Sequence, residues 1–453
     1  MKTTTEDIPG PPAASRSRRA TLASSVAVVV LMALTLAGCG EDRPAQGDGG
    51  DDPEQRLAAA AEAFTGQGEG ASGPVKIPPG IHRFFDELEQ ATRSPDARPP
   101  TDFFSVDGMV EALKAAGHLE GLGRSQLAAF RTGLEQGLEN LGGTLAQMAF
   151  DRHRIVRVED LDAGAKLVYV RLDDNELNIT SYYRWWLMPE SGSWKAFDFE
   201  EVELGWRFIE ISGLLLKAMM GDQPEPWVED FGSLVTTLQG LDMTDPESFV
   251  VMAPHLEQVR THELPNEINR FVSVLTASTH LVEGDAEASL REIEAARSGG
   301  YSSALYHYQK GSALMMMEKY SEALEEFNAQ AELLGWNSDL LEMVSEAHLM
   351  TGDRASARDA ALRGLEDNPA ATNCVAWLAA ASTVEEIRVG DFNAYFAATG
   401  DPEWAYELTM DLLLELGHDE QAQALLWRLR GDFPKSHLVD YYLGVLRGAS
   451  GRL

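Results

Sequence analysis

A period of 34 residues in the C-terminal half limits what this chain can fold into more than any other feature. Segments that begin at Arg270, Ala304 and Ser338 share one pattern of small and turn-forming residues. Their eighth places hold Ala277, Gly311 and Ser345, and their twentieth places hold Ser289, Ala323 and Ala357. Small residues let two antiparallel helices approach closely, and a Gly-Asp turn ends the first of them. Each segment therefore predicts a pair of packed helices.

Later segments keep the same phase. One begins near Glu403, and a helix restarts at His437 with Leu443-Gly444 at its seventh and eighth places. This pattern resembles the tetratricopeptide repeat (TPR) family over residues 266–453, which implies a C-terminal TPR-type α-solenoid. The segment 372–402 departs from the pattern, because it lacks a clean second helix, and is expected to bend or interrupt the solenoid. An unrelated helical bundle is the alternative.

The middle of the chain, residues 80–221, is typical of an α+β domain. Helical patterns come first, and alternating apolar and polar residues then predict four strands, at His153–Val158, Lys166–Leu172, Glu176–Met188 and Ser193–Leu204. Turn-forming residues between the strands predict a four-stranded antiparallel sheet. Residues 222–265 are expected to form connecting helices. The predicted fold is therefore mainly α, with an α+β domain before the solenoid.

The third and fourth strands, with the sequence SYYRWWLMPESGSWKAFDF, resemble part of the cystatin-like roll of ketosteroid-isomerase-type proteins. In such rolls an acid inside the cup can act as a general base, a role that would fall to Asp198. We favour a solvated Asp198 on the outer face. Trp186 alternates with Trp185 along the third strand. Its face is expected either to be covered by the helices of residues 81–149 or to form a docking platform, and covering is favoured because large aromatics are mostly buried.

The N-terminus is predicted to be an export signal over residues 1–38, because basic residues precede an apolar run that ends in small residues. Leu36-Ala37-Gly38-Cys39 resembles the lipobox of bacterial lipoproteins, which implies that Cys39 is acylated, with chains such as palmitate, and begins the mature chain. An uncleaved helix with an accidental cysteine is the alternative. Residues 39–79 are poor in apolar side chains and are expected to form a flexible acidic tether.

The charge balance excludes some partners. The chain has 37 Lys and Arg against 72 Asp and Glu, so its net charge is −35. A surface with this charge repels phosphate backbones, and we expect no nucleic acid among its partners. The chain has two cysteines, Cys39 and Cys374, so acylation of Cys39 leaves no pair for an internal disulfide.

The sequence offers little support for catalysis. It has no His-Glu-x-x-His, Gly-x-Ser-x-Gly, phosphate-loop or Cys-x-x-Cys motif, and no two of its histidines form an i, i+4 pair. We therefore expect no catalytic residues, no cofactor and no metal site. Cys374 lies in an apolar helix and is interpreted as a buried, inert thiol.

The TPR resemblance also implies which residues line a concave, partner-binding face. Among the residues at those places, the candidates are Phe271, Tyr308, Met315, Met316, Glu342, Glu346, Met350, Glu407 and Asp411. One stretch is apolar with adaptable methionines and the next is acidic, which favours a protein or peptide partner of basic and apolar character. The alternative is that these acids only reflect the overall negative charge.

These patterns favour a non-enzymatic interaction or scaffold lipoprotein, anchored through Cys39 to a bacterial membrane in the cell envelope and facing the periplasm or exterior. In a cell with two membranes, Gly40 after the cysteine favours the outer one by family resemblance. The alternative is a lipoprotein that holds a small apolar ligand or lipid in its α+β roll.

Overall fold

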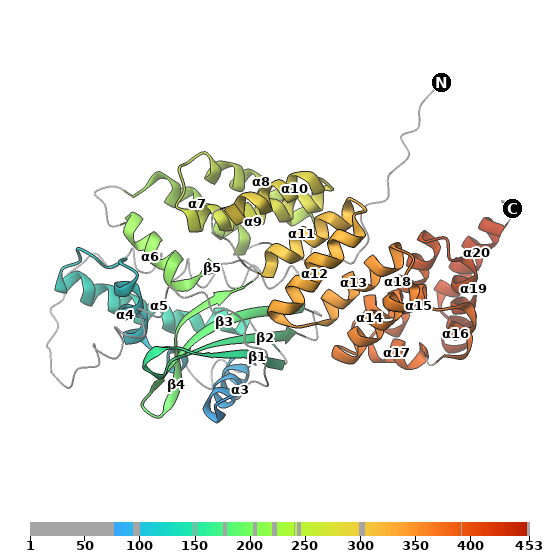
Figure 1. Ribbon diagram of the computed structural model, residues 1–453, viewed down its shortest axis with the longest axis horizontal. Helices are drawn as coiled ribbons and strands as arrows, with labels where there is room; N and C mark the ends of the chain where they lie inside the picture. The colour runs from blue at the N-terminus through green and yellow to red at the C-terminus, as the bar shows by residue number, and fades with distance from the viewer. Residues whose placement is uncertain are drawn as a thin grey trace, which may run out of the picture. The chain divides into compact units, whose positions relative to one another are not determined.

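The computed structural model describes residues 77–93, 100–147, 150, 152–174, 179–202, 206–219, 224–239, 241, 246–298, 304–390 and 392–450. They fall into two compact units, one up to Gln309 and one from Lys310 onward, and each is described by itself (Figure 1). Cys39, the predicted signal and nearly all of the predicted tether lie outside the described residues. None of the helices that the structure describes combines the length and apolar character needed to cross a bilayer.

The first unit contains the predicted antiparallel sheet. Its strands follow one another in chain order: β1 (Arg152–Asp160), β2 (Lys166–Asp174), β3 (Ile179–Glu190), β4 (Ser193–Glu201) and β5 (Trp206–Arg207). The four long strands confirm the prediction, and the two-residue β5 adds a short edge strand that the sequence did not indicate. Ser191 and Gly192 form the tight turn between β3 and β4, and both have positive φ.

Helices cover one face of this sheet. The helical segments that precede the sheet are α3 (Pro79–Arg93), η3 (Pro100–Phe103), α4 (Val106–Ala115) and α5 (Arg124–Gln147), and a short η4 (Asp162–Gly164) lies between β1 and β2. On the covered face Trp185 is buried, and its ring contacts those of Phe84 and Phe85 from α3 and Phe199 from β4. Large aromatic rings therefore fill this side of the sheet.

Further helices complete the first unit: α6 (Phe208–Met219), α7 (Pro226–Gln239), α8 (Pro246–Arg260), α9 (Asn266–Glu283) and α10 (Ala286–Ser298). Gly284 ends α9 in the left-handed conformation, as the Gly-Asp turn predicts, and its N–H donates to carbonyls in the last turn of the helix. Although α9 opens the predicted repeats, Phe271 and Leu275 on it belong to the same apolar core as the sheet.

The second unit is helical, as predicted (Figure 1). Helix α11 (Ala304–Met316) crosses the boundary between the units. The helices after it are α12 (Tyr320–Leu334), α13 (Ser338–Met350), α14 (Arg354–Asp367), α15 (Thr372–Ala381), α16 (Val384–Val389), α17 (Phe392–Ala398), α18 (Pro402–Glu415), α19 (Asp419–Asp432) and α20 (His437–Ser450).

Small residues at the eighth place let the two helices of a pair approach closely. At Gly311 on α11, an added Cβ would lie 2.4 Å from the ring of Phe327 on α12. On α13, the hydroxyl of Ser345 donates to the carbonyl of Ala357 on α14, at 2.8 Å. The small residue that recurs at the eighth place therefore marks where the second helix of a pair packs on the first.

The irregular segment 372–402 keeps the first helix of a pair and shortens the second. Helix α15 packs against α13, α14 and α18, which is the place of a first helix. The six-residue α16 follows it and packs against α19. Thr383 and Glu386 form a capping box that starts α16. The array therefore continues through this segment with one short helix.

Replacing Gly311 with alanine tests this packing. We expect Gly311→Ala to lower the free energy of unfolding by about 1–3 kcal/mol, because the new methyl group overlaps the buried Phe327 ring. Gly444→Ala on α20 is the matched control, because its Cβ would meet no atom within 4 Å. Urea unfolding followed by circular dichroism measures both. Equal stability for Gly311→Ala and wild type would contradict the proposed close approach.

Candidate interaction surface

Two rows of residues, one on α13 and one on α18, make up the candidate interaction surface. Residues four apart lie on one face of a helix, one turn after another. The α13 row holds Glu346 and Met350, and the α18 row holds Glu407, Asp411 and Glu415. Helix α15 packs against both helices. It is rich in alanine, so the helix between the rows carries few long side chains.

The two rows interact electrostatically, because the charge of Glu415 on α18 acts on Glu346 of α13. Glu346 is half-buried, and its burial together with the negative charge of Glu415 raises its pKa to about 7. Among the described residues, no ion-pair partner is found for either carboxylate. Two like charges on different helices, one of them partly withdrawn from water, form a place where a cation would be stabilised.

A tyrosine on α12 lies near enough to Glu346 to be affected by its charge. Tyr320, the first residue of α12, is half-buried, and its pKa is raised by burial and by the negative charges of Glu318 and Glu346. A tyrosine ring next to carboxylates can accept a cationic side chain over its face as well. Leu349 and Met350 on α13 are half-buried against the apolar core of the second unit, and supply flexible apolar contact area near the acids.

The structure distributes the sequence-predicted residues between the two units. Phe271 and Tyr308 belong to the first unit, where Phe271 is 1% exposed and packs edge-on against Phe231. Tyr308 is half-buried. A core residue such as Phe271 has no surface to offer a partner, so we leave it out of the candidate surface.

The remaining candidates lie in the second unit with different exposures. Met315 is buried, whereas Met316 is 40% exposed at the end of α11. Glu342 is also buried, and its carboxylate accepts a hydrogen bond of 2.9 Å from the amide of Asn373 on α15. Met315 and Glu342 are therefore used in packing between helices. Glu346 and Met350 are half-buried.

The two α18 acids among the sequence-predicted candidates, Glu407 and Asp411, are exposed, and α20 holds the carboxylate of Asp411. The hydroxyl of Tyr442 donates to a carboxylate oxygen of Asp411, at 2.7 Å, and lies 3.1 Å from the carbonyl of Glu407. This hydrogen bond holds the exposed Asp411 carboxylate in place. Sequence reasoning missed Tyr442 and Tyr320, because nothing local indicates which distant helix a tyrosine will meet.

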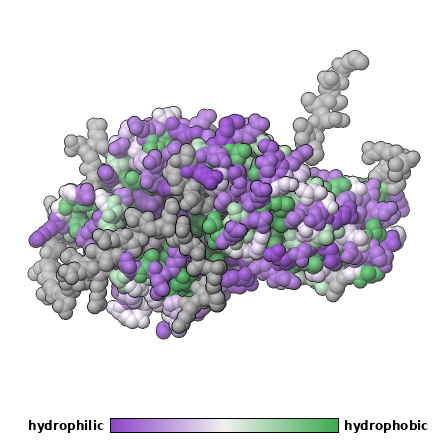
Figure 2. Space-filling view, viewed as in Figure 1, coloured by the Kyte–Doolittle hydropathy of each residue, from purple (hydrophilic) through white to green (hydrophobic). Residues whose placement is uncertain are grey.

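Hydrophilic residues predominate on the second unit in the face shown in Figure 2, with scattered hydrophobic side chains between them. Nowhere in the described part of the chain do three or more His, Cys, Asp or Glu residues gather in a way that could hold a metal ion. Cys374 is buried, as expected, and burial raises the pKa of its thiol above the ordinary value.

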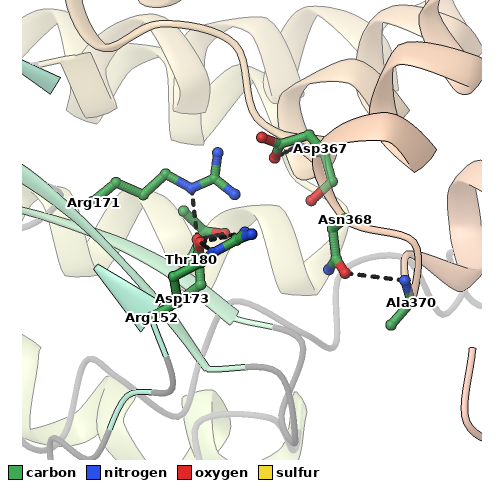
Figure 3. Close-up of polar contacts among 8 residues, drawn as sticks. Arg152, Arg171, Asp173, Thr180, Asp367, Asn368 and Ala370 are labelled. Carbon is green, nitrogen blue, oxygen red and sulfur yellow. Dashed lines mark hydrogen bonds and ion pairs between the residues drawn. The ribbon is translucent and has the colours of Figure 1, made fainter. Parts of the chain in front are cut away.

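The second face of the sheet carries charges that the sequence did not reveal. On this face the Asp173 carboxylate accepts hydrogen bonds from Arg152, Arg171 and Thr180, three of its neighbours on the strands (Figure 3). Farther along the same face, the guanidinium of Arg207 lies 4.0 Å from the centre of the Trp186 ring. Trp186 is 7% exposed and so is buried, but the cover expected from the helices of residues 81–149 is found on the other face, where Phe84 and Phe85 contact Trp185.

The expectation of a solvated Asp198 is wrong. Asp198 is fully buried, pairs with Arg207, and accepts hydrogen bonds from the backbone N–H groups of Phe199 and Ile209. Burial raises its pKa to about 6, while the charge of Arg207 acts in the opposite direction. A short fifth strand brings Arg207 to this position, and the strand pattern gave no sign of it. The buried pair joins β4 to the start of α6.

No family model matches the chain, and no curated protein matches it either.

Removing the Asp198 carboxylate should destabilise the first unit strongly. We expect Asp198→Ala to lower the free energy of unfolding by about 3 kcal/mol, because it leaves the Arg207 charge buried without its carboxylate. Asp198→Asn, which keeps an acceptor for the two backbone N–H groups, should cost less. Chemical denaturation measures both, with the exposed Asp162→Ala as the control. If Asp198→Ala has the same free energy of unfolding as wild type, this ion pair is dispensable for stability.

The raised pKa of Glu346 predicts a pH-dependent stability. The folded state holds a proton on Glu346 up to about pH 7, whereas the unfolded chain releases it near the ordinary value of 4.5. Stability therefore falls as pH rises between these values, and the cost is fully present above pH 7. We expect Glu346→Gln to be more stable than wild type by about 1–2 kcal/mol in mildly alkaline buffer. In acid the difference should vanish; a difference independent of pH would contradict this explanation.

Proposed function

We propose that this protein is a non-enzymatic interaction or scaffold protein that binds a basic and apolar segment of a partner protein. The binding surface is formed by the two rows on α13 and α18, together with Tyr320. Through a lipid on Cys39 the protein is anchored in the bacterial cell envelope, facing the periplasm or exterior, and the outer membrane is favoured where there are two membranes.

The observation that carries this proposal is the pairing of Glu346 with Glu415. Helices α13 and α18 bring together two carboxylates that repel each other, and the described residues offer them no cation. Such an arrangement costs stability in the free protein. A lysine or arginine from a partner removes that cost, so part of the binding free energy comes from relief of the repulsion.

The apolar part of the partner is expected to contact methionine and leucine side chains. Met350 and Leu349 lie on the same helix as Glu346, and Met316 is exposed shortly before Tyr320. Unbranched methionines adapt to different apolar shapes, which suits a surface that binds an extended or helical segment. Phe271, Met315 and Glu342 take no part in this surface.

The alternative, an apolar ligand in the α+β roll, has less support. Such a ligand needs an emptied apolar cavity. On the face of the sheet that the helices cover, Trp185 is packed against Phe84, Phe85 and Phe199, so side chains occupy the space beside it.

A designed peptide tests the proposed surface directly. The probe is a fluorescent amphipathic peptide of lysine and leucine, with a glutamate–leucine peptide as its charge-reversed counterpart. We expect the lysine peptide to bind wild type and the Glu346→Gln/Glu415→Gln variant to bind it at least about tenfold more weakly. Association should be slower in the variant and less sensitive to salt, because steering depends on these charges.

Two controls separate a specific site from general attraction to an acidic protein. Glu420→Gln removes an exposed acid from α19 and should leave the affinity unchanged. Wild-type affinity should rise with pH through about 7, as Glu346 loses its proton, and this rise should disappear in Glu346→Gln. If Glu346→Gln and Glu346→Gln/Glu415→Gln both bind the lysine peptide as wild type does, the two rows are not the binding surface.

A further inference from the structure

An exposed tryptophan, Trp404, lies at the start of the α18 row. It belongs to the first turn of α18, one turn before Glu407 and two turns before Asp411, and its side chain is 50% exposed. Residues at these spacings share one face of a helix. The indole ring therefore lies on the same face as the acids of the α18 row.

The exposure of Trp404 does not come from a missing neighbour. Helix α18 has a first helix on each side, because α15 packs against it and α20 is joined to it by hydrogen bonds from Ser436 to Glu403 and from Tyr442 to Asp411. Ala405 and Tyr406, the next two residues of α18, are buried. The array therefore leaves this ring open although the helices around it are in place.

Three other tryptophans of this protein carry an arginine over the ring. The pairs, with the distance from the guanidinium carbon to the ring centre, are Arg207 and Trp186 (4.0 Å), Arg363 and Trp336 (5.0 Å), and Arg430 and Trp427 (5.5 Å). Trp427 is 59% exposed, so an arginine covers a ring even at the surface of this array. Among the described residues, no cation lies over Trp404.

The charges around Trp404 favour a cation. Asp401, Glu403 and Glu407 lie within three residues of it in the chain, and no base does. These acids outweigh the roughly half positive charge that the start of a helix carries. Glu407 is exposed and has no ion-pair partner in the part of the chain that the structure describes. Lys435, before the start of α20, is exposed and forms no ion pair there either.

Arginine suits a tryptophan ring beside a carboxylate better than lysine does. A guanidinium is planar, so it lies flat over the indole while its N–H groups still donate to a carboxylate at the edge of the ring. The ammonium group of lysine is a strongly hydrated point charge and makes no flat stack. The three rings that are already covered in this protein are covered by arginine.

We propose that Trp404 and Glu407 form an arginine site, so that the α18 row prefers a partner segment that contains arginine to one that contains lysine. The guanidinium of the partner lies over the Trp404 ring and donates to the Glu407 carboxylate. This inference rests on the proposed function, because it names the basic residue that the same surface selects. Trp404 is the specificity-determining residue, a role that the acids alone do not supply.

Two fluorescent peptides test this preference: the lysine–leucine peptide and the same peptide with arginine in place of every lysine. Their charges are equal, so the acids attract both alike. We expect wild type to bind the arginine peptide about three- to fivefold more tightly in fluorescence anisotropy, the ratio that an exposed cation–π contact provides. Trp404→Leu should bind the two peptides with equal affinity.

Trp427→Leu is the matched control, because Trp427 is also exposed but its ring is already covered by Arg430. This variant should keep the preference for the arginine peptide. The melting temperature of Trp404→Leu should equal that of wild type, because the ring is half-exposed. A lost preference with an unchanged melting temperature then reports the ring and not the fold.

The site can also be tested without a peptide. The indole N–H signal of Trp404 in NMR spectra is identified by its absence from Trp404→Leu. Wild type is titrated with N-acetyl-arginine amide and, separately, with N-acetyl-lysine amide. We expect the arginine compound to shift this signal at a lower concentration than the lysine compound, because only the guanidinium stacks on the ring.

The outcomes separate this inference from the proposed function. If wild type binds both peptides equally well, or if the preference survives in Trp404→Leu, the arginine site is wrong, even where Glu346→Gln/Glu415→Gln still weakens binding and the proposed function holds. If neither peptide binds but the arginine compound still shifts the Trp404 signal at the lower concentration, the proposed function is wrong and the arginine site is supported.

Discussion

The close approach of two helices at a small residue is the contact on which the C-terminal array depends. Gly311 under Phe327 and Ser345 against the Ala357 carbonyl are two forms of the same constraint. A longer side chain at either place would push the second helix away and tilt the pair. Because the constraint recurs in phase, the first helices α13, α15 and α18 stay in contact through the irregular segment 372–402.

This packing lets the array keep charges in positions that cost stability. Glu346 lies partly out of water and close to the charge of Glu415, which is unfavourable in the free protein. Stabilising contacts elsewhere, such as the stacked rings of Phe396 and Tyr406, do not involve these acids. Under the proposed function, stability and recognition are carried by different side chains of the same helices.

The first unit uses charge differently. Asp198 and Arg207 are buried together, and two backbone N–H groups also donate to the same carboxylate. Such a pair adds little net stability compared with apolar side chains, but removing one partner is costly. It fixes how β5 and α6 follow β4 at the edge of the sheet, where strand pairing alone is short.

The sequence by itself determined the α+β domain, the strand order and the phase of the helix pairs. These depend on local periodicity and on small residues at regular spacing, as in Gly311 and Ser345, which a chain carries wherever it folds. Tertiary structure alone decided which polar residues are buried: Glu342 under Asn373, Asp198 with Arg207, and Glu346 near Glu415. The sequence around an acidic residue looks the same whether its side chain is in water or in a core. Its environment is set by residues that lie far away in the chain.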